Sequence, residues 1–478
     1  MRVLWQDSLQ EDYFFLFSPE LIPTEKQMTD QQISGNIARF ICFRMFFNAR
    51  FYYPVFALFF LEHGLTWVEF GILNGIWAIS IILLEVPSGA LADTIGRKKL
   101  ILVAALCMVI EMLALLLAPM DGGSTVFLLF ALNRIISGVA EAAVSGADEA
   151  LAYDSLKQAG RENEWGDVLE KAQKFTSLAF FFAMMTGSAF YDSSFINHCL
   201  AFAGIDYSFT AETLIKAPVF LTFLSSLVVL FAAFGMKETG TKAKNQTIVE
   251  TVRRSFQTTL TGASWVWRTP LPFGILLASM VLDNVIRQFL TIASAYWSVI
   301  DLPLATFGLV ASGMSLMGYF IPRVAKKMAE HQTPNQNFFL LCFILVIGLF
   351  GISEAIPIWG ILPAVLLYAT MQSMNYLASR YLNEAAPSEQ RATVLSFRGL
   401  STNVSYGAVS LLYSSLIAWI KLKGVDSLIS AEHDNQQDAV FVEALGWSPW
   451  YFLLTLLFTI LIFRFRFPKK DASQSDRS

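Results

Sequence analysis

The chain has 478 residues, of which 55% are hydrophobic and 15% charged, and its 34 basic and 38 acidic side chains give a net charge of −4. Soluble domains average about 25% charged residues. This composition therefore excludes a disordered chain, a coiled coil, a disulfide scaffold and a basic nucleic-acid binder. It predicts an integral membrane protein. The four cysteines have neither zinc-type nor redox spacing, so no metal or cofactor is expected.

The apolar residues are grouped in long runs. A helix needs about 20 mainly apolar residues to span a bilayer. Runs of this kind cover residues 34–61, 68–91, 100–118, 126–150, 170–190, 216–236, 271–298, 305–325, 337–355, 359–382, 393–420 and 448–465. The sequence therefore predicts an all-α membrane protein with about twelve transmembrane helices.

A polar stretch over residues 237–269 divides these runs into two sets of six. We expect an N-terminal tail (1–33), a six-helix bundle (34–236), a cytoplasmic linker (237–269), a second six-helix bundle (270–466) and a C-terminal tail (467–478). Within the linker, residues 248–260 have an amphipathic pattern, typical either of a helix on the membrane surface or of a plain linker helix. Basic clusters follow both the second and the eighth run, which indicates two related halves, as secondary transporters have.

Lysine and arginine residues fall mostly on one side of the predicted membrane. The opposite loops contain only Lys216, Lys421 and Lys423 among the basic residues and are otherwise acidic. By the positive-inside rule, both termini are expected in the cytoplasm. These outer loops also lack Asn-x-Ser/Thr sequons, which is compatible with a bacterial inner membrane.

The turn after the second run contains a family signature. Residues 85–99 read EVPSGALADTIGRKK, which resembles the G-x-L-A-D-x-x-G-R-K motif of the major facilitator superfamily. A looser likeness to the R-x-x-x-G element of that family begins at Arg134 in the fourth run. The resemblance implies two six-helix bundles related by pseudo-twofold symmetry, which move a small molecule across the membrane by alternating access.

We expect a cytoplasmic gate around this signature, formed by Glu85, Gly89, Asp93, Gly96, Arg97 and Asp154. Gly89 would let the second span approach a neighbouring helix closely. The resemblance implies that Asp93 faces the N-terminus of the eleventh span, where a carboxylate is favourable. Arg97 is expected to pair with Asp154. The alternative is a positively charged anchor without any role in gating.

Ionisable side chains inside the predicted spans are candidates for substrate or proton handling, because they are costly in lipid. Arg134, Glu141 and Asp148 follow one another at intervals of seven residues, which puts them on one helix face. The alternative is a buried structural ion pair between Arg134 and Glu141. Asp283 and Arg287 are adjacent on one face of the seventh run.

The resemblance implies that the first, fourth, seventh and tenth spans line a central cavity. The predicted cavity residues are Arg44, Asn48, Arg134, Glu141, Asp148, Asp283, Arg287, Gln372, Asn375 and Tyr376. Arg50 is predicted to point away from the face that carries Arg44 and Asn48. Glu111, on the peripheral third span, is expected to have a structural role.

These observations predict a secondary active transporter for a small organic solute. Proton coupling is expected, with Glu141 as the first candidate carrier and Asp283 as the second. No G-x-x-x-x-G-K-[ST] loop is present, so ATP is not the expected energy source. The expected partners are the solute, protons and the lipid bilayer, and a monomer is expected.

Two other function classes stay open, a non-transporting sensor of the same fold and a membrane-embedded enzyme. The sequence contains neither an H-E-x-x-H motif nor a Cys/His cluster that would favour an enzyme. The direction of transport is also open. The fifth run has one glycine and no proline over residues 184–189, unlike the glycine- and proline-rich element of proton-coupled exporters.

Overall fold

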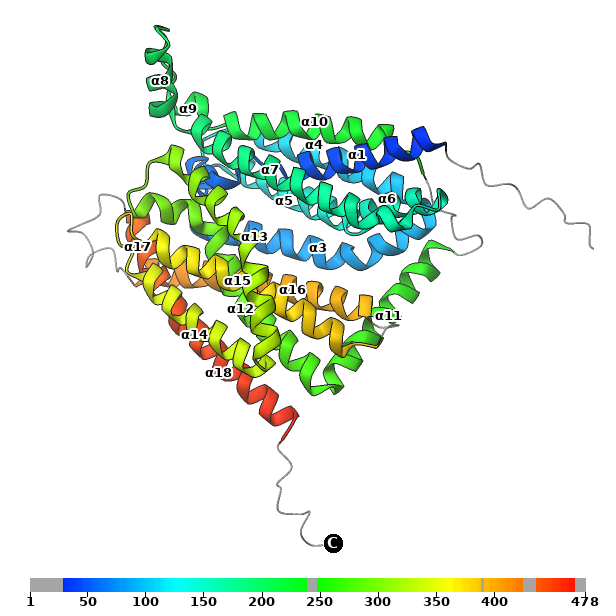
Figure 1. Cartoon of the computed structure of the whole chain (residues 1–478). Helices are drawn as coiled ribbons and strands as arrows, with labels where there is room; N and C mark the ends of the chain where they lie inside the picture. Colours follow the sequence, from blue (N-terminus) through cyan, green and yellow to red (C-terminus); the bar gives the residue numbers. More distant parts are fainter. Residues whose placement is uncertain (1–28, 239–246, 388–390, 424–435, 469–478) are drawn as a thin grey trace, which may run out of the picture.

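The computed structural model describes residues 29–238, 247–387, 391–423 and 436–468, with the side chains at positions 93, 248, 392 and 436–438 left out. Nearly all of the described residues are helical, and none of them forms a strand (Figure 1). The helices fall into a first half, which ends at Gly235, and a second half, which begins at Pro270.

Among the described residues, the first half contains ten α-helices and two short 3₁₀ helices. They are α1 (Asp30–Asn48), η1 (Tyr53–Val55), α2 (Phe56–Glu62), α3 (Trp67–Ile95), α4 (Arg97–Leu117), α5 (Ser124–Val144), α6 (Ala147–Gln158), η2 (Glu162–Glu164), α7 (Trp165–Tyr191), α8 (Ser193–Phe202), α9 (Ala211–Leu214) and α10 (Ala217–Gly235).

One helix, α11 (Ile248–Arg268), lies between the halves in sequence. The second half then contains α12 (Pro270–Val299), η3 (Leu304–Thr306), α13 (Phe307–His331), α14 (Pro334–Ser353), α15 (Ile361–Ala385), α16 (Arg391–Leu422), α17 (Gln436–Gly446) and α18 (Ser448–Arg466).

Several of these helices begin at a capping box, in which a threonine and a residue three positions later satisfy each other's backbone amides. Thr66 and Glu69 form one at the start of α3, and Thr333 and Gln336 form another at the start of α14. These boxes provide hydrogen-bond partners for amides that lack one inside the helix. They therefore fix where each apolar segment begins.

By length and composition, nine helical segments of the described residues can cross a membrane. The helices α1, α7 and α15 fall outside this group, and each carries charged residues near an end, such as Lys171 and Lys174 on α7. Elsewhere the predicted runs follow the helices closely: the run 271–298 corresponds to α12, Pro270–Val299.

The first predicted span, residues 34–61, is interrupted. The helix α1 ends at Asn48, and the chain resumes helical structure at η1 and α2 only from Tyr53 onward. Pro54 is the second residue of η1, directly after the interruption, where its ring fixes φ and removes a backbone donor. The break gives Arg50 a direction that an unbroken helix would not allow.

The fourth predicted span, residues 126–150, is interrupted as well. The helix α5 ends at Val144, and Gly146 adopts a left-handed conformation with φ of 75° before α6 begins at Ala147. Asp148 therefore belongs to a different helix from Arg134 and Glu141, and the prediction of one continuous polar stripe is wrong. The seven-residue spacing applies only within an uninterrupted helix.

The two halves pack against each other mainly through two helix pairs, α3 with α16 and α7 with α13. Small residues bring α3 and α16 together. A Cβ at Gly71 would overlap the Ser414 hydroxyl, and a Cβ at Gly75 would lie 3.0 Å from the Leu411 side chain. Close contacts of this kind are typical of membrane helix interfaces.

The halves are joined most closely at one end, which we call the Asp192 end. There, Ala57 donates a backbone hydrogen bond of 2.9 Å to the Ser294 hydroxyl, and Ala305 donates one of 3.1 Å to Asp192. We call the opposite end, where α4 begins, the Arg97 end. In Figure 1 the outer helices of the two halves diverge toward the Arg97 end, where α11 lies against α3 and α16.

Candidate functional site

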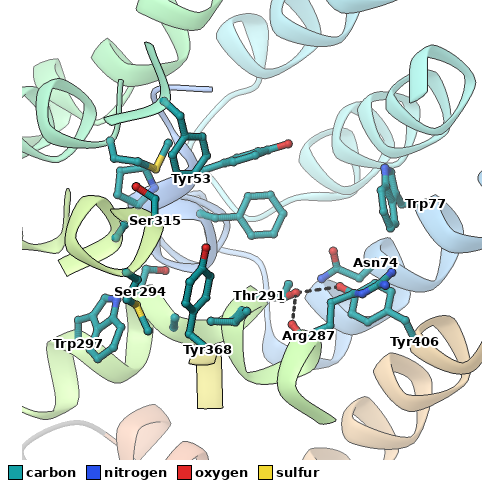
Figure 2. Close-up of a pocket in the computed structure, with 18 of the residues that line it drawn as sticks. Tyr53, Asn74, Trp77, Arg287, Thr291, Ser294, Trp297, Ser315, Tyr368 and Tyr406 are labelled. Carbon is teal, nitrogen blue, oxygen red and sulfur yellow. Dashed lines mark hydrogen bonds between the residues drawn. The ribbon is translucent and has the colours of Figure 1, made fainter. Parts of the chain in front are cut away.

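A cavity of about 360 Å³ lies between the two halves. Its walls come from η1, α2, α3, α5 and α7 of the first half and from α12, α13, α15 and α16 of the second half. Aromatic side chains form much of this wall (Figure 2). They include Tyr53, Phe56, Trp77, Trp297, Tyr368 and Tyr406.

The charged residues in the wall are Arg134 and Glu141 on α5 and Arg287 on α12. All three are predicted cavity residues, and the cavity brings the two arginines from opposite halves together around one space. Small-molecule sites are usually apolar pockets with a few polar groups that orient the ligand. The cavity has this composition, so it can bind a small organic molecule.

Arg134 is buried, with 5% of its surface exposed. Its Nε and Nη2 donate hydrogen bonds of 3.0 and 2.9 Å to the Asn133 side-chain oxygen. The guanidinium also lies over the rings of Phe56 and Phe60, at 5.2 and 5.5 Å from their centroids. Among the described residues, no carboxylate forms a salt bridge with Arg134.

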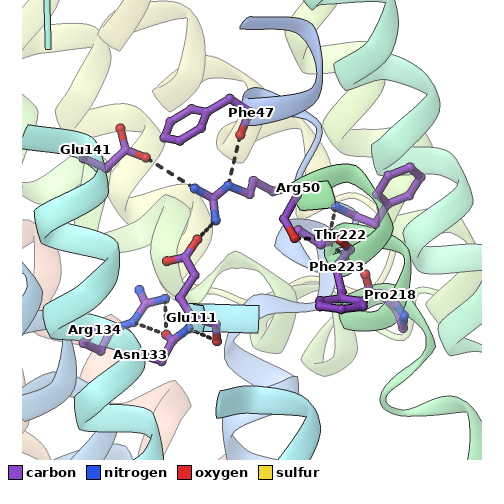
Figure 3. Close-up of polar contacts among 11 residues, drawn as sticks. Phe47, Arg50, Glu111, Asn133, Arg134, Glu141, Pro218, Thr222 and Phe223 are labelled. Atoms are coloured by element: carbon purple, nitrogen blue, oxygen red, sulfur yellow. Dashed lines mark hydrogen bonds and ion pairs between the residues drawn. The ribbon is translucent and has the colours of Figure 1, made fainter. Parts of the chain in front are cut away.

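Arg50 lies behind the cavity wall, between two carboxylates (Figure 3). Its Nη1 donates to Glu111, and its Nη2 lies 3.8 Å from a Glu141 oxygen. Arg50 also donates to the Phe47 backbone carbonyl at 3.1 Å. The alternative of a structural ion pair between Arg134 and Glu141 is therefore wrong. The break after α1 turns Arg50 inward, so that Arg50 is the cationic partner of Glu141.

The two carboxylates beside Arg50 differ in their access to the cavity. The Glu111 side chain is fully buried, whereas 38% of the Glu141 side-chain surface is exposed. Asn133 donates a 2.9 Å hydrogen bond to the Glu111 backbone carbonyl and thereby connects this pair to Arg134. Only Glu141 of the two can exchange a proton directly with the contents of the cavity.

A second polar cluster lies on the opposite wall. Arg287 forms a 2.6 Å salt bridge with Asp283, which is buried behind it, and donates a 2.9 Å hydrogen bond to Asn403 on α16. The guanidinium lies 5.4 Å from the centroid of the Tyr406 ring, and the Tyr406 hydroxyl is 3.1 Å from that of Thr291. The positive charge of Arg287 is thus balanced within its own helix.

The predicted cavity residues of the first span lie outside the cavity wall. Arg44 forms salt bridges with Asp148 at 3.4 Å and Glu149 at 2.5 Å, on α6 near the Arg97 end. Asn48 donates to the Arg44 backbone carbonyl at 2.7 Å. The salt bridge of Arg44 with Asp148 therefore holds α1 against α6, and Asn48 is exposed on α1.

Of the predicted residues of the tenth span, Gln372 supports the wall from behind. Gln372 donates a 2.7 Å hydrogen bond to the hydroxyl of Tyr368, which itself lines the cavity. Asn375 accepts a 2.7 Å hydrogen bond from Arg398 on α16. Tyr376 is half-buried and is not part of the wall. This span thus contributes Tyr368 to the wall directly and Gln372 indirectly.

At the Arg97 end, Arg97 forms the predicted salt bridge with Asp154 and donates a 2.9 Å hydrogen bond to the Ala150 carbonyl. Gly96 has a φ of 105°, as a tight turn between α3 and α4 requires. Glu238 accepts hydrogen bonds from the backbone amides of Arg97 and Lys98, at 3.2 and 3.1 Å. A carboxylate is favourable at this helix N-terminus, and sequence analysis missed Glu238.

The other predicted gate residues give a mixed result. Nothing lies within 4 Å of a Cβ placed on Gly89, so the predicted close helix contact at this glycine is wrong. The helix α3 instead approaches α16 through Gly71 and Gly75. Glu85 is half-buried and faces Gly399 of α16. The side chain of Asp93 lies outside the described residues.

Sequence analysis also missed several residues of the cavity wall, notably Tyr53, Asn74, Trp77 and Thr291. Asn74 carried a usable signal, because a polar amide inside a long apolar run has to face other protein groups. Tyr53 precedes Pro54, which marked the helix break. Trp77 had no such signal, since an aromatic residue in a span packs equally well against lipid or protein.

The sequence and the fold both match known proteins. Residues 40–410 match the Major Facilitator Superfamily. A bacterial homologue of the human lysosomal transporter Spinster, in an inward-facing and unoccupied conformation, is 13% identical, with 92% of this chain and 98% of that chain covered and a TM-score of 0.66.

Two further solved structures share the fold. A variant of the nucleoside transporter NupG is 12% identical over 88% of this chain and 99% of that chain, with a TM-score of 0.63. A D-xylose–proton symporter is 14% identical over 91% and 97% of the two chains, with a TM-score of 0.59. No protein of curated function matches the sequence. Because the family match extends over most of its length, the chain belongs to the Major Facilitator Superfamily and is a twelve-helix, two-bundle secondary transporter rather than an enzyme.

Proposed function

We propose that the protein transports a small organic solute through the central cavity, that transport is coupled to protons, and that Glu141 carries the proton. The observation that carries this proposal is the position of Glu141. It lines the cavity, is 38% exposed and lies 3.8 Å from Arg50, which Glu111 also contacts. A carboxylate that shares one guanidinium with another carboxylate can take up a proton and still leave Arg50 paired.

The other candidate carriers fit this role less well. Glu111 is fully buried, and Asp283 is only 3% exposed and held by Arg287 at 2.6 Å. Neither opens onto the cavity. Asp148 lies on α6 beside Arg44 and outside the wall. Asp283 stays the second candidate, because a movement of Arg287 toward a solute would break their salt bridge and let Asp283 take up a proton.

Alternating access is the proposed means of transport, with the cavity reached from the Arg97 end in this conformation. The contacts of Ala57 with Ser294 and of Asp192 with Ala305 close the opposite end. The basic residues of the signature support a cytoplasmic Arg97 end with both termini inside. The lack of Asn-x-Ser/Thr sequons in the outer loops is the support for a bacterial inner membrane. In the opposite conformation, the signature and the pair of Arg97 with Asp154 would form the cytoplasmic gate. We propose a monomer.

The substrate is a small organic molecule in this proposal. The structures that share the fold include a nucleoside transporter, a D-xylose–proton symporter and a peptide transporter. The D-xylose–proton symporter supports the proposal of proton coupling, because it is a proton symporter with the same fold. At 12–14% identity, these likenesses concern the fold.

The test begins with a thermal-shift screen of the purified protein against metabolites and drugs, followed by flux in proteoliposomes with and without a pH gradient. The Glu141→Gln variant is expected to lose accumulation driven by the gradient and to keep exchange at equal pH, because the amide cannot titrate. Glu170→Gln, at an exposed carboxylate of α7, is the matched control. Full accumulation in Glu141→Gln would remove Glu141 as the carrier. Ligand binding without any flux would indicate a sensor instead.

A further inference from the structure

Four ionisable side chains of the first half, Arg50, Glu111, Arg134 and Glu141, form a cluster beside the cavity. Arg50 contacts the carboxylates of Glu111 and Glu141, and Asn133 links the Glu111 backbone carbonyl to the Arg134 guanidinium. Two of these four ionisable side chains are basic and two are acidic, so the fully ionised cluster is neutral. A net charge inside a protein is costly unless it is compensated.

Protonation of Glu141 would leave this cluster with one excess positive charge. Arg50 would still be paired with Glu111, so the uncompensated cation would be Arg134, which forms no salt bridge with any described residue. Arg134 lines the cavity. An anion beside Arg134 would restore neutrality, and a carboxylate suits a guanidinium best because two parallel hydrogen bonds can form.

The opposite wall supplies no comparable site. Arg287 forms a salt bridge with Asp283 and is held by Asn403. Arg398, which also faces Asp283, donates to Asn375 and lies outside the wall.

The cavity wall also carries aromatic side chains, among them Phe56, over whose ring the Arg134 guanidinium lies, and Trp77 and Tyr406 (Figure 2). Aromatic side chains favour flat aromatic ligands through stacked or edge contacts.

We propose that the cavity binds a small aromatic monoanion, with its carboxylate on Arg134, and that one proton binds to Glu141 together with each anion. This inference rests on the proposed function. It adds the charge and the chemical class of the solute and the number of protons that bind with it. Arg134 and Glu141 are seven residues apart on α5, about 10 Å along the helix. The anion and the proton therefore occupy separate positions and do not compete.

The groups that face Glu141 come from two neighbouring segments and from α5 itself. They are Arg50 and Tyr53 of the segment after α1, Glu111 of α4, and Arg134, which precedes Glu141 on α5 by about two turns. Arg50 and Arg134 favour the ionised carboxylate, whereas Glu111 opposes it. An anion on Arg134 cancels one of the two favourable charges, so that the proton binds more tightly to Glu141. Such coupling is reciprocal.

Phenylacetate and indole-3-acetate are suitable probes, each compared with its neutral amide. Binding to the purified protein is measured by calorimetry from pH 6 to 9, in buffers of different ionisation enthalpy. We expect the carboxylates to bind, the amides to bind at least about tenfold more weakly, and one proton to be taken up per anion. The dissociation constant should rise about tenfold per pH unit once Glu141 is ionised in the free protein.

Three variants test the assigned residues. Glu141→Gln should bind the carboxylates independently of pH and without proton uptake. Arg134→Gln should weaken carboxylate binding at least about tenfold and leave amide binding unchanged, and Arg134→Lys should retain part of the affinity. Glu170→Gln should behave as the wild type. Proton uptake by the wild-type protein keeps the test valid even if one variant does not fold.

The inference is overturned if the amides bind as well as the carboxylates, if no carboxylate binds, or if binding takes up no proton. These outcomes are distinct from a failure of the proposed function. A neutral solute that accumulates with the pH gradient would keep proton-coupled transport and exclude the anion. Carboxylate binding with proton uptake but without flux would keep the linked site and exclude transport.

Discussion

The hydroxyl of Ser188 accepts a 2.9 Å hydrogen bond from the backbone amide of Gly308, and this contact joins α7 of the first half to α13 of the second. There is no space for a side chain at this glycine, because a Cβ would overlap the Met184 carbonyl. The halves are therefore in backbone contact near the Asp192 end. A transporter that opens at this end has to separate these two helices.

Gly308→Val is expected to favour the conformation that is open at the Asp192 end. Overpacking costs about 1–3 kcal/mol, so the population of the separated conformation should rise about fivefold or more. The measurement is the rate at which an impermeant thiol reagent, added outside intact cells, labels a cysteine introduced at Ser294. Gly313→Val on the same helix is the control, since its Cβ would meet nothing within 4 Å. Equal labelling in both variants would contradict the prediction.

Glu111→Leu is expected to destabilise the protein by about 3–5 kcal/mol, because it removes the main partner of a fully buried arginine. Unfolding of the purified variant in detergent would measure this loss. Adding Arg50→Met should recover most of it, since an apolar pair can replace a buried ion pair. If the double variant is as unstable as Glu111→Leu, then the charge of Arg50 is not the cause.

Arg97→Gln and Asp154→Asn are each expected to slow transport with little effect on stability. About a quarter of each side chain is exposed, 24% and 27%, and ion pairs of this kind contribute about 0–1 kcal/mol. The double exchange Arg97→Asp with Asp154→Arg should restore part of the flux. Arg161→Gln, which breaks an exposed 2.7 Å pair with Glu164, serves as the control. Wild-type flux in both single variants would show that the signature is only an anchor.

Cys199 on α8 is expected to react with an impermeant maleimide added outside intact cells, because it is exposed and lies beyond the Asp192 end. The other three cysteines, Cys42, Cys107 and Cys342, are half-buried within helices and should react slowly. Replacement of Cys199 by serine should remove the fast labelling. Protection of Cys199 in intact cells, with labelling after lysis, would reverse the proposed orientation.

The sequence was sufficient to predict the positions of most helices, because each span in lipid has to be a long apolar run. It was not sufficient for the breaks at Tyr53 and Gly146. A short turn inside a span leaves the hydropathy nearly unchanged, yet it alters the direction of every side chain after it. The sequence therefore predicts Asp148 on the same helix face as Arg134 and Glu141, whereas α5 ends at Val144, before Asp148.

The sequence predicts the cavity residues Arg134, Glu141 and Arg287, because a charged side chain inside a span has to face a cavity or other protein groups rather than lipid. The partner of each charge was not predictable. Glu111 follows Arg50 by 61 positions, and their contact depends on the bend after α1. Helix periodicity relates residues within one helix and carries no information about which helices become neighbours.

The pairing of Arg50 with Glu111 has a consequence for how the protein enters the membrane. The ribosome adds about 5–20 residues per second, so Glu111 is made about 3–12 s after Arg50. During this interval the guanidinium has no partner, and an arginine in the bilayer centre costs at least about 2.5–3.5 kcal/mol. The first two spans are therefore expected to stay beside the translocon until the third is synthesised, so that the first half enters the lipid as a preassembled group of helices.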